Sequence, residues 1–244
     1  WYTRGLANSE LKKTEAALED FTKAVDAGYN EAIVFYKMGV LNFQLKKYEE
    51  ALAKFSKAID ADPQFAYAYN DRASVKRKLE NYDGAIVDYS IAVQMNPKLA
   101  VAYNNMGSVK KKQKDFEGAI VDYSIAIKVK PDYHIAYNNR GSVKYEQKKY
   151  KEAVEDYQKA ISLKPDYVFA YNNLGTARMK LEDYTGALEA FNKAIDINPD
   201  YGFAYANRGN AKEMLRDWEG ACEDWQKAYE LGVLQVAPYI LDCK

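Results

Sequence analysis

The stretch AVAYNNMGSVKKKQKDFEGAIVDYSIAIKVKPDY, residues 100–133, decides the fold of this chain. Its first half carries Ala100, Tyr103 and Met106 at the spacing of one helix face. Its second half carries Ala119 and Tyr123 in the same way. The stretch therefore predicts two amphipathic helices.

The residues between and after these halves predict the helix boundaries. Lys114 and Asp115 separate the halves, and Pro131 follows the second half. Because proline lacks an amide hydrogen and clashes with the preceding turn, it ends the helix there. Asp132 is a residue type that suits the start of a following helix. The stretch is therefore predicted to be a helical hairpin.

The hairpin recurs with a period of 34 residues. Five of the six prolines keep this period: Pro63, Pro97, Pro131, Pro165 and Pro199. One set of alanines keeps it without exception: Ala17, Ala51, Ala85, Ala119, Ala153, Ala187 and Ala221. We predict seven units over residues 1–233, starting near residues 1, 32, 66, 100, 134, 168 and 202. Such a fixed period is typical of an all-α solenoid of stacked hairpins with one continuous core.

The repeated pattern resembles the tetratricopeptide repeat (TPR) family. The unit at residues 168–201 matches the family signature through Tyr171, Leu174, Gly175, Tyr184, Ala187, Phe191, Ala194 and Pro199. The resemblance runs from Trp1 to about Gly232, and the segment ACEDWQKAYELG near its end looks bacterial. It implies a right-handed α-solenoid of about seven helix-turn-helix units, whose first helices line a concave groove that binds proteins.

Small residues predict close packing of the two helices in a unit. Positions are counted from the first residue of each full unit: Ala32, Ala66, Ala100, His134, Val168 and Gly202. Position 8 is glycine in all units but one, which has Ala73. Because glycine costs up to about 1 kcal/mol inside a helix, it needs a packing reason. We expect the alanine at position 20 to be its counterpart.

Charged residues at fixed positions predict a link between the paired helices. Each unit with arginine at position 7 has aspartate at position 23: Arg4 with Asp20, Arg72 with Asp88, Arg140 with Asp156 and Arg208 with Asp224. Lys54 takes the place of the aspartate where position 7 is Met38. We therefore predict partly buried ion pairs. The alternative is that the cations bind anionic ligands.

The last residues depart from the repeat. Residues 234–244 carry Val236, Tyr239 and Ile240, and we predict a C-terminal capping helix and tail there. Cys222 and Cys243 lie at similar distances on either side of a turn near Gly232, so the two thiols are predicted to approach each other. The sequence leaves open a disulfide and a pair of small buried thiols.

One stripe of the first helices, at positions 2, 5, 6, 9, 12 and 13, is not needed for the core. The resemblance places this stripe inside the groove. We predict that it binds peptide through Asn70, Asn104, Asn105, Asn138, Asn139, Asn172, Asn173, Asn207, Tyr67, Ile135, Phe169, Phe203, Arg77, Lys111 and Tyr145. Asn105, Asn139, Asn173 and Asn207 match the asparagine ladder with which some family members hold peptides.

The residue types of the stripe favour an extended peptide as ligand. Asparagine is a poor helix-interior residue, so its repetition calls for a reason. Primary amides offer donors and an acceptor to a peptide main chain, and the apolar row at position 2 offers contacts to side chains. Arg77 and Lys111 favour an acidic segment in the ligand. Two alternatives remain. The asparagines bond to one another, or they recur only because the repeat unit was duplicated recently and they have no function of their own. Some family members bind the acidic C-terminal tail of a partner with a carboxylate clamp of lysine, arginine and asparagine residues. No three consecutive units of this sequence carry these residues at the required positions, so we do not expect this mode of binding.

Other functions are less well supported by the sequence. The one histidine, His134, has no metal-ligand spacing around it, and there is no glycine-rich phosphate loop, so we expect no catalysis, metal or cofactor. Balanced charge, 35 basic against 35 acidic residues, makes single-stranded RNA binding a weaker alternative. Self-assembly into an oligomer is another.

The compartment stays open. No apolar run approaches the length of a membrane helix. The sequence opens on Trp1 within a unit, so we expect further N-terminal sequence, in which a signal peptide is not excluded.

Overall fold

A computed structural model describes residues 1–241 and 243 of the chain. Within them lie fifteen α-helices, one 3-10 helix and no strand. The helices are α1 (Tyr2–Glu10), α2 (Thr14–Asp26), α3 (Ala32–Gln44), α4 (Tyr48–Ala61), α5 (Ala66–Lys78), α6 (Tyr82–Met95), α7 (Ala100–Lys112), α8 (Phe116–Val129), α9 (His134–Glu146), α10 (Tyr150–Leu163), α11 (Val168–Lys180), α12 (Tyr184–Ile197), α13 (Gly202–Met214), α14 (Trp218–Glu230), η1 (Leu234–Val236) and α15 (Ala237–Leu241). The predicted all-α fold of helical hairpins is confirmed.

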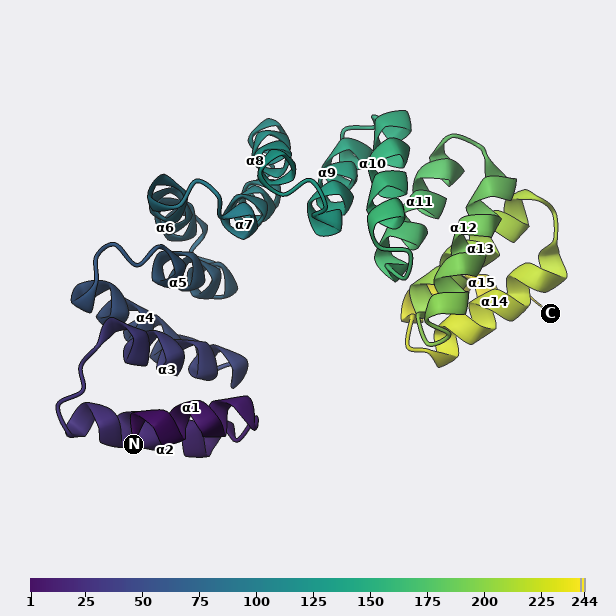
Figure 1. Cartoon of the computed structure of the whole chain (residues 1–244). Coiled ribbons are helices and arrows are strands. Elements are labelled where there is room, and N and C mark those ends of the chain that lie inside the picture. Colours follow the sequence, from purple (N-terminus) through teal and green to yellow (C-terminus); the bar gives the residue numbers. More distant parts are fainter. Residues whose placement is uncertain (242, 244) are drawn as a thin grey trace. The chain divides into compact units, whose positions relative to one another are not determined.

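The chain divides into two compact units, which we call unit 1 (residues 1–115) and unit 2 (residues 116–244). Unit 1 holds α1 to α7, and its consecutive helices pack on one another (Figure 1). Unit 2 holds α8 to α15, and the same is true of its helices. Within the described residues, no helix has the length and apolar character that a membrane span requires.

Two kinds of residue end the helices. The five regularly spaced prolines all lie in loops that follow a second helix, as predicted. The turn inside each hairpin has a charged residue with positive φ: Lys12, Lys46, Glu80, Lys114, Lys148, Glu182 and Arg216, at φ 56 to 65°. A residue in this left-handed conformation commonly closes the C-terminus of a helix. These two signals set where the first and second helices end.

The core of each hairpin is formed by alanines and one aromatic ring from the second helix. The ring at position 24 is buried throughout: Phe21, Phe55, Tyr89, Tyr123, Tyr157, Phe191 and Trp225. The alanines on either side of each ring are buried as well. The aromatic residues at position 24 therefore belong to the core.

The glycine at position 8 packs against this ring. A Cβ atom at Gly141 would lie 2.8 Å from Cε1 of Tyr157 and 3.2 Å from the carbonyl oxygen of Ala153. The predicted close packing is present. However, its main counterpart is the ring at position 24, and the alanine at position 20 contributes only its backbone oxygen.

We therefore expect Gly141→Ala to destabilise unit 2. A methyl group forces the Tyr157 ring to move, and such overpacking costs about 1–3 kcal/mol. Lys151→Ala, at an exposed position of α10, is the control. Its expected change in the free energy of unfolding is within about 0.5 kcal/mol. Urea unfolding measures both, and an unchanged midpoint for Gly141→Ala would contradict the packing argument.

The predicted ion pairs between paired helices are confirmed. Asp156 on α10 is 4% exposed, and its Oδ1 lies 2.7 Å from an Nη of Arg140 on α9. Nε of the same arginine donates to Oδ2 at 2.9 Å. Nζ of Lys144 lies 2.9 Å from Oδ2. Asp88 is held in the same way by Arg72 and Lys76, and Asp224 by Arg208 and Lys212.

The arginine at position 7 also reaches the preceding repeat. Arg140 donates to Oγ of Ser124 on α8 at 3.0 Å, and Arg208 donates to Oδ1 of Asn192 on α12 at 2.7 Å. Each guanidinium therefore connects three helices. The hydrogen bond with Asp156 raises the pKa of Arg140 above its usual value, so the cation is retained.

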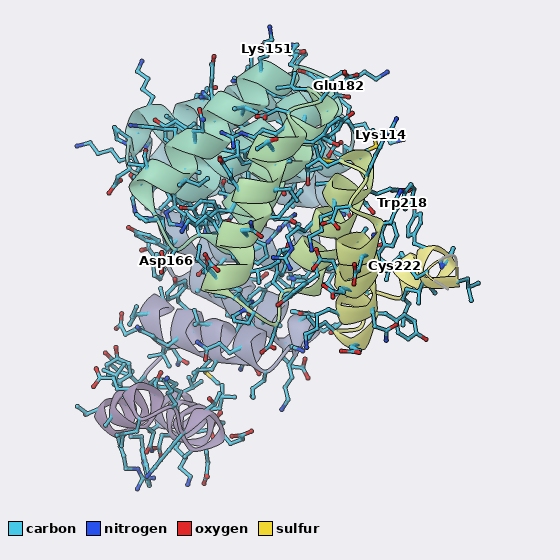
Figure 2. All side chains as sticks on the ribbon, turned by 90° about the vertical axis from the view of Figure 1, so that its right-hand side faces the viewer. Lys114, Lys151, Asp166, Glu182, Trp218 and Cys222 are labelled. Atoms are coloured by element: carbon cyan, nitrogen blue, oxygen red, sulfur yellow. A yellow bond between two sulfur atoms is a disulfide. The ribbon has the colours of Figure 1, made fainter. Side chains whose placement is uncertain are left out.

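The C-terminal tail folds back on α14. Val236 is buried, and the ring of Tyr239 stacks on Trp225 with centroids 5.1 Å apart. The predicted capping segment thus contains η1 and α15; Asp242 and Lys244 lie outside the described residues. A disulfide joins Cys222 to Cys243, with Cα atoms 5.6 Å apart, which decides between the two alternatives for the cysteines (Figure 2).

Candidate functional site

The predicted asparagine pairs divide into buried and partly exposed members. The position 5 asparagines are buried: Asn70, Asn104, Asn138 and Asn172. The position 6 asparagines are half-buried: Asn105, Asn139, Asn173 and Asn207.

In unit 2 the asparagines bond to one another between repeats. Nδ2 of Asn173 on α11 donates to Oδ1 of Asn138 on α9 at 3.0 Å. Nδ2 of Asn207 on α13 donates to Oδ1 of Asn172 on α11 at 2.9 Å. Each bond uses one of the two amide hydrogens of its donor. The alternative that the asparagines pair among themselves is therefore correct for these two pairs. These two bonds leave Asn173 and Asn207 each with a second amide hydrogen and a side-chain carbonyl.

In unit 1 the same register carries a tyrosine and an aspartate. The hydroxyl of Tyr36 on α3 donates to Oδ2 of Asp71 on α5 at 2.7 Å. Nδ2 of Asn70 donates to Oδ1 of Asp71 at 2.8 Å. Oδ1 of Asn70 is buried and accepts no hydrogen bond from the described residues. The first helices of unit 1 therefore carry an unused acceptor and a carboxylate where unit 2 has an amide pair.

An aromatic row follows the start of the first helices in unit 2. It consists of His134, Tyr167, Phe169, Tyr201 and Phe203, with successive ring centroids 4.9, 5.7, 5.7 and 6.0 Å apart. Phe169 and Phe203 are 49% and 55% exposed. Burial raises the pKa of Tyr167 and Tyr201 above the usual tyrosine value and lowers that of His134 below the usual histidine value, so the row is uncharged at neutral pH.

The remaining residues that were predicted to bind peptide lie outside this aromatic row. Tyr67 on α5 is 50% exposed, and Ile135 on α9 is half-buried. Tyr145 on α9 is half-buried, and its ring lies 5.3 Å from that of Tyr150 on α10. Arg77 and Lys111 are half-buried near the ends of α5 and α7.

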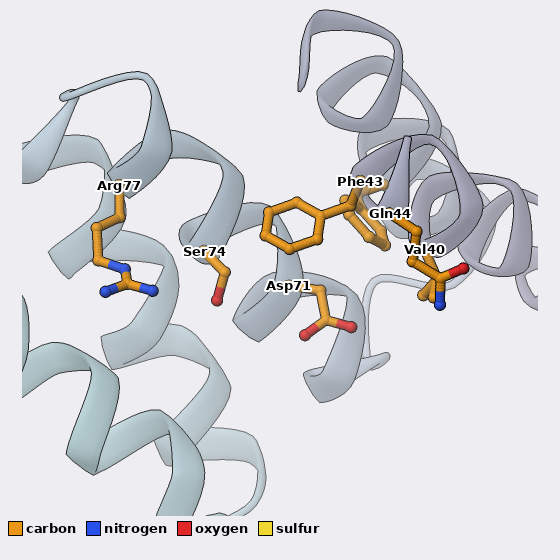
Figure 3. Close-up of a pocket in the computed structure, with 7 residues that line it drawn as sticks. Val40, Phe43, Gln44, Asp71, Ser74 and Arg77 are labelled. Atoms are coloured by element: carbon orange, nitrogen blue, oxygen red, sulfur yellow. The ribbon is translucent and has the colours of Figure 1, made fainter. Parts of the chain in front are cut away.

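A cavity of about 280 Å³ lies between α3 and α5 of unit 1 (Figure 3). Its walls are formed by Val40, Phe43, Phe55, Asp71, Ser74 and Arg77. A second cavity, of about 190 Å³, occupies the same repeat positions in unit 2. Its walls include Thr176, Met179, Phe191, Asn207 and Asn210. The face of the first helices is therefore hollowed at the same register in both units.

Some of these residues were missing from the prediction. The tyrosines that precede the first helices, Tyr167 and Tyr201, have a loop position that gave no reason to place them beside position 2. The position of Phe43 varies among the units, so it gave no signal, whereas Asp71 stands where the four following units carry asparagine. An aspartate among aligned asparagines is the signal that would have identified the unit 1 cavity.

Sequence comparison identifies the family. Two segments, residues 107–148 and 141–182, match a profile described as TPR repeat. Residues 168–201 and residues 2–66 match profiles described as tetratricopeptide repeat. The chain belongs to the tetratricopeptide repeat family. A comparison with curated proteins finds no match.

Solved structures share the fold. A chain of the APC/C hetero-tetramer Cut9–Hcn1 has a TM-score of 0.77 at 18% identity, covering 91% of this chain and 44% of that one. This chain thus spans less than half of that relative. PilF of Pseudomonas aeruginosa has a TM-score of 0.76 at 20% identity, covering 86% of this chain and 97% of its own. YrrB, described as a TPR protein with an unusual peptide-binding site, has a TM-score of 0.59 at 26% identity, covering 77% of this chain and 96% of its own.

Proposed function

We propose that this chain is a non-catalytic protein-interaction scaffold that binds an extended peptide segment of a partner along its first helices. Membership in the tetratricopeptide repeat family and the similarity to YrrB, which has a peptide-binding site, support this class of function. The observation that carries the proposal is the pairing, on α11 and α13, of half-buried amides with exposed aromatic rings.

The amides and the aromatic rings would contact different parts of a bound peptide. The Asn138 and Asn172 carbonyls fix the position 6 amides of Asn173 and Asn207, so little side-chain freedom is lost when a ligand binds. The remaining amide hydrogen and carbonyl pair with main-chain groups of the peptide. Phe169 and Phe203 contact its apolar side chains. Arg77 and Lys111 favour carbonyl or acidic groups of the ligand.

A library of random dodecapeptides displayed on phage tests the proposal. We expect the intact chain to select peptides, and Phe169→Ala/Phe203→Ala to weaken a selected peptide about tenfold or more, because both rings lose apolar contact area. Isothermal titration calorimetry measures the affinity. Gln158→Ala, on the exposed face of α10, is the control and should bind like the wild type. Failure to select any peptide would refute the proposal.

Salt dependence separates peptide from single-stranded RNA. RNA binding is expected to lose affinity steeply between 50 and 200 mM salt through counterion release, by about 300-fold for six phosphate contacts on a single strand. Peptide binding at an uncharged aromatic row is expected to change by less than about threefold over the same interval, because few charges are screened. Light scattering at increasing protein concentration tests self-assembly independently.

A further inference from the structure

The cavity between α3 and α5 has room for one long side chain. Its volume of about 280 Å³ lies just below the range of sites that enclose whole small molecules. Val40, Phe43 and Phe55 form an apolar wall, and Asp71 and Arg77 lie at different ends of the polar wall (Figure 3). The occupant that fits has an apolar stem and polar ends.

The Asp71 end of this cavity lacks a cation. Its carboxylate accepts hydrogen bonds from two neutral groups, the Tyr36 hydroxyl at 2.7 Å and the Asn70 amide at 2.8 Å. Among residues 1–241 and 243, no lysine or arginine forms an ion pair with it. Burial raises the pKa of Asp71 above its usual value. A carboxylate removed from water is normally compensated by a positive charge.

At the other end of the cavity, the Arg77 side chain has neighbours of its own. Its guanidinium interacts electrostatically with Tyr89, whose hydroxyl lies 2.9 Å from Oγ of Ser74. Nε of Arg77 is buried and has no acceptor among the described residues. Since Arg77 lies six residues after Asp71, about 9 Å along α5, a cation seated at Asp71 is separated from the guanidinium.

The equivalent cavity of unit 2 has no carboxylate in its walls. Asn207 stands where unit 1 has Asp71, and Met179 stands where unit 1 has Phe43. A carboxylate together with an aromatic ring attracts an ammonium or guanidinium group, because the ring face interacts with cations within about 6 Å. The unit 2 cavity has no such combination. The two cavities are therefore built for different ligand residues.

We propose that the cavity of unit 1 binds one lysine or arginine side chain of the peptide ligand, with its cation at Asp71 and its stem along Phe43. This inference rests on the proposed peptide-binding function and adds a residue preference to it. The charge complementarity between Asp71 and the ligand cation fixes the register of the peptide on unit 1.

Selection of the random dodecapeptide library against three proteins tests this proposal: the wild type, Asp71→Asn and Glu50→Gln. We expect lysine or arginine to be enriched at one fixed position of the peptides selected by the wild type. Asp71→Asn reproduces the residue of the unit 2 cavity and is expected to select peptides without that preference. Glu50→Gln removes an exposed carboxylate of α4 and should behave like the wild type.

Calorimetry with one selected peptide gives the size of the effect. Replacing its basic residue by norleucine should weaken binding to the wild type about tenfold to a hundredfold, as expected for a hydrogen bond to a charged group. The same replacement should change binding to Asp71→Asn by less than threefold. Selection of peptides without a basic preference, or an equal preference in Asp71→Asn, would overturn this proposal and leave peptide binding intact. Selection of no peptide would overturn both.

Discussion

Replacing Asp156 by alanine is expected to lower the stability of unit 2 by about 3–5 kcal/mol. The substitution removes the buried carboxylate that Arg140 and Lys144 share. It leaves Arg140 without its counter-charge and Lys144 with only the exposed Glu152, 3.7 Å away. Arg140 also keeps its bond to Ser124 of the preceding repeat, so its side chain cannot simply turn to water without breaking that link. We therefore expect a drop of several degrees in the melting temperature.

Glu155→Ala is the matched control, since Glu155 precedes Asp156 on α10 and is exposed. Its expected effect is within about 0.5 kcal/mol. Thermal unfolding followed by circular dichroism compares the two variants. Equal losses would show that the network contributes no more than a surface charge. The double variant Arg140→Met/Asp156→Leu removes both charges and should recover part of the loss.

Reduction of the Cys222–Cys243 disulfide is expected to destabilise the C-terminal end of unit 2 by about 3 kcal/mol. The bond closes a loop with a sequence separation of 21 residues, and a loop of this size restricts the unfolded chain by about that amount. The five-residue helix α15 has too few hydrogen bonds to persist by itself, so it depends on Val236, Tyr239 and the disulfide.

Hydrogen exchange with and without a dithiol reductant measures this effect. We expect amides of α14 and α15 to exchange faster after reduction, and amides of α9 and α10 to exchange at an unchanged rate. The double variant Cys222→Ser/Cys243→Ser should show the faster rates and no response to the reductant. Unchanged protection of α14 in the reduced wild type would contradict the prediction.

The sequence alone predicted the structural features that recur from one repeat unit to the next. Pro131 and its equivalents predicted the helix boundaries, because proline ends a helix whatever its surroundings. The ion pair of Arg140 with Asp156 was predictable because every unit with arginine at position 7 has aspartate at position 23. Each of these features lies within a single repeat unit. It can therefore be recognised by comparing the seven units of the sequence with one another.

Contacts between repeats were harder to predict. Whether Asn173 bonds to Asn138 depends on the distance between α9 and α11, which a sequence pattern does not give. The cavity beside Asp71 depends on the space that Phe43 and Val40 leave, which is a property of packing. The pairing of Cys222 with Cys243 was one of two alternatives until the turn after α14 placed their Cα atoms 5.6 Å apart.

The location of a bound peptide tests the central claim most directly. A library-selected peptide carrying a photoreactive benzophenone can be cross-linked to the intact chain, and mass spectrometry then identifies the attached residues. We predict cross-links on α9, α11 and α13, around Ile135, Phe169 and Phe203. Cross-links confined to the second helices α10, α12 and α14 would contradict the account.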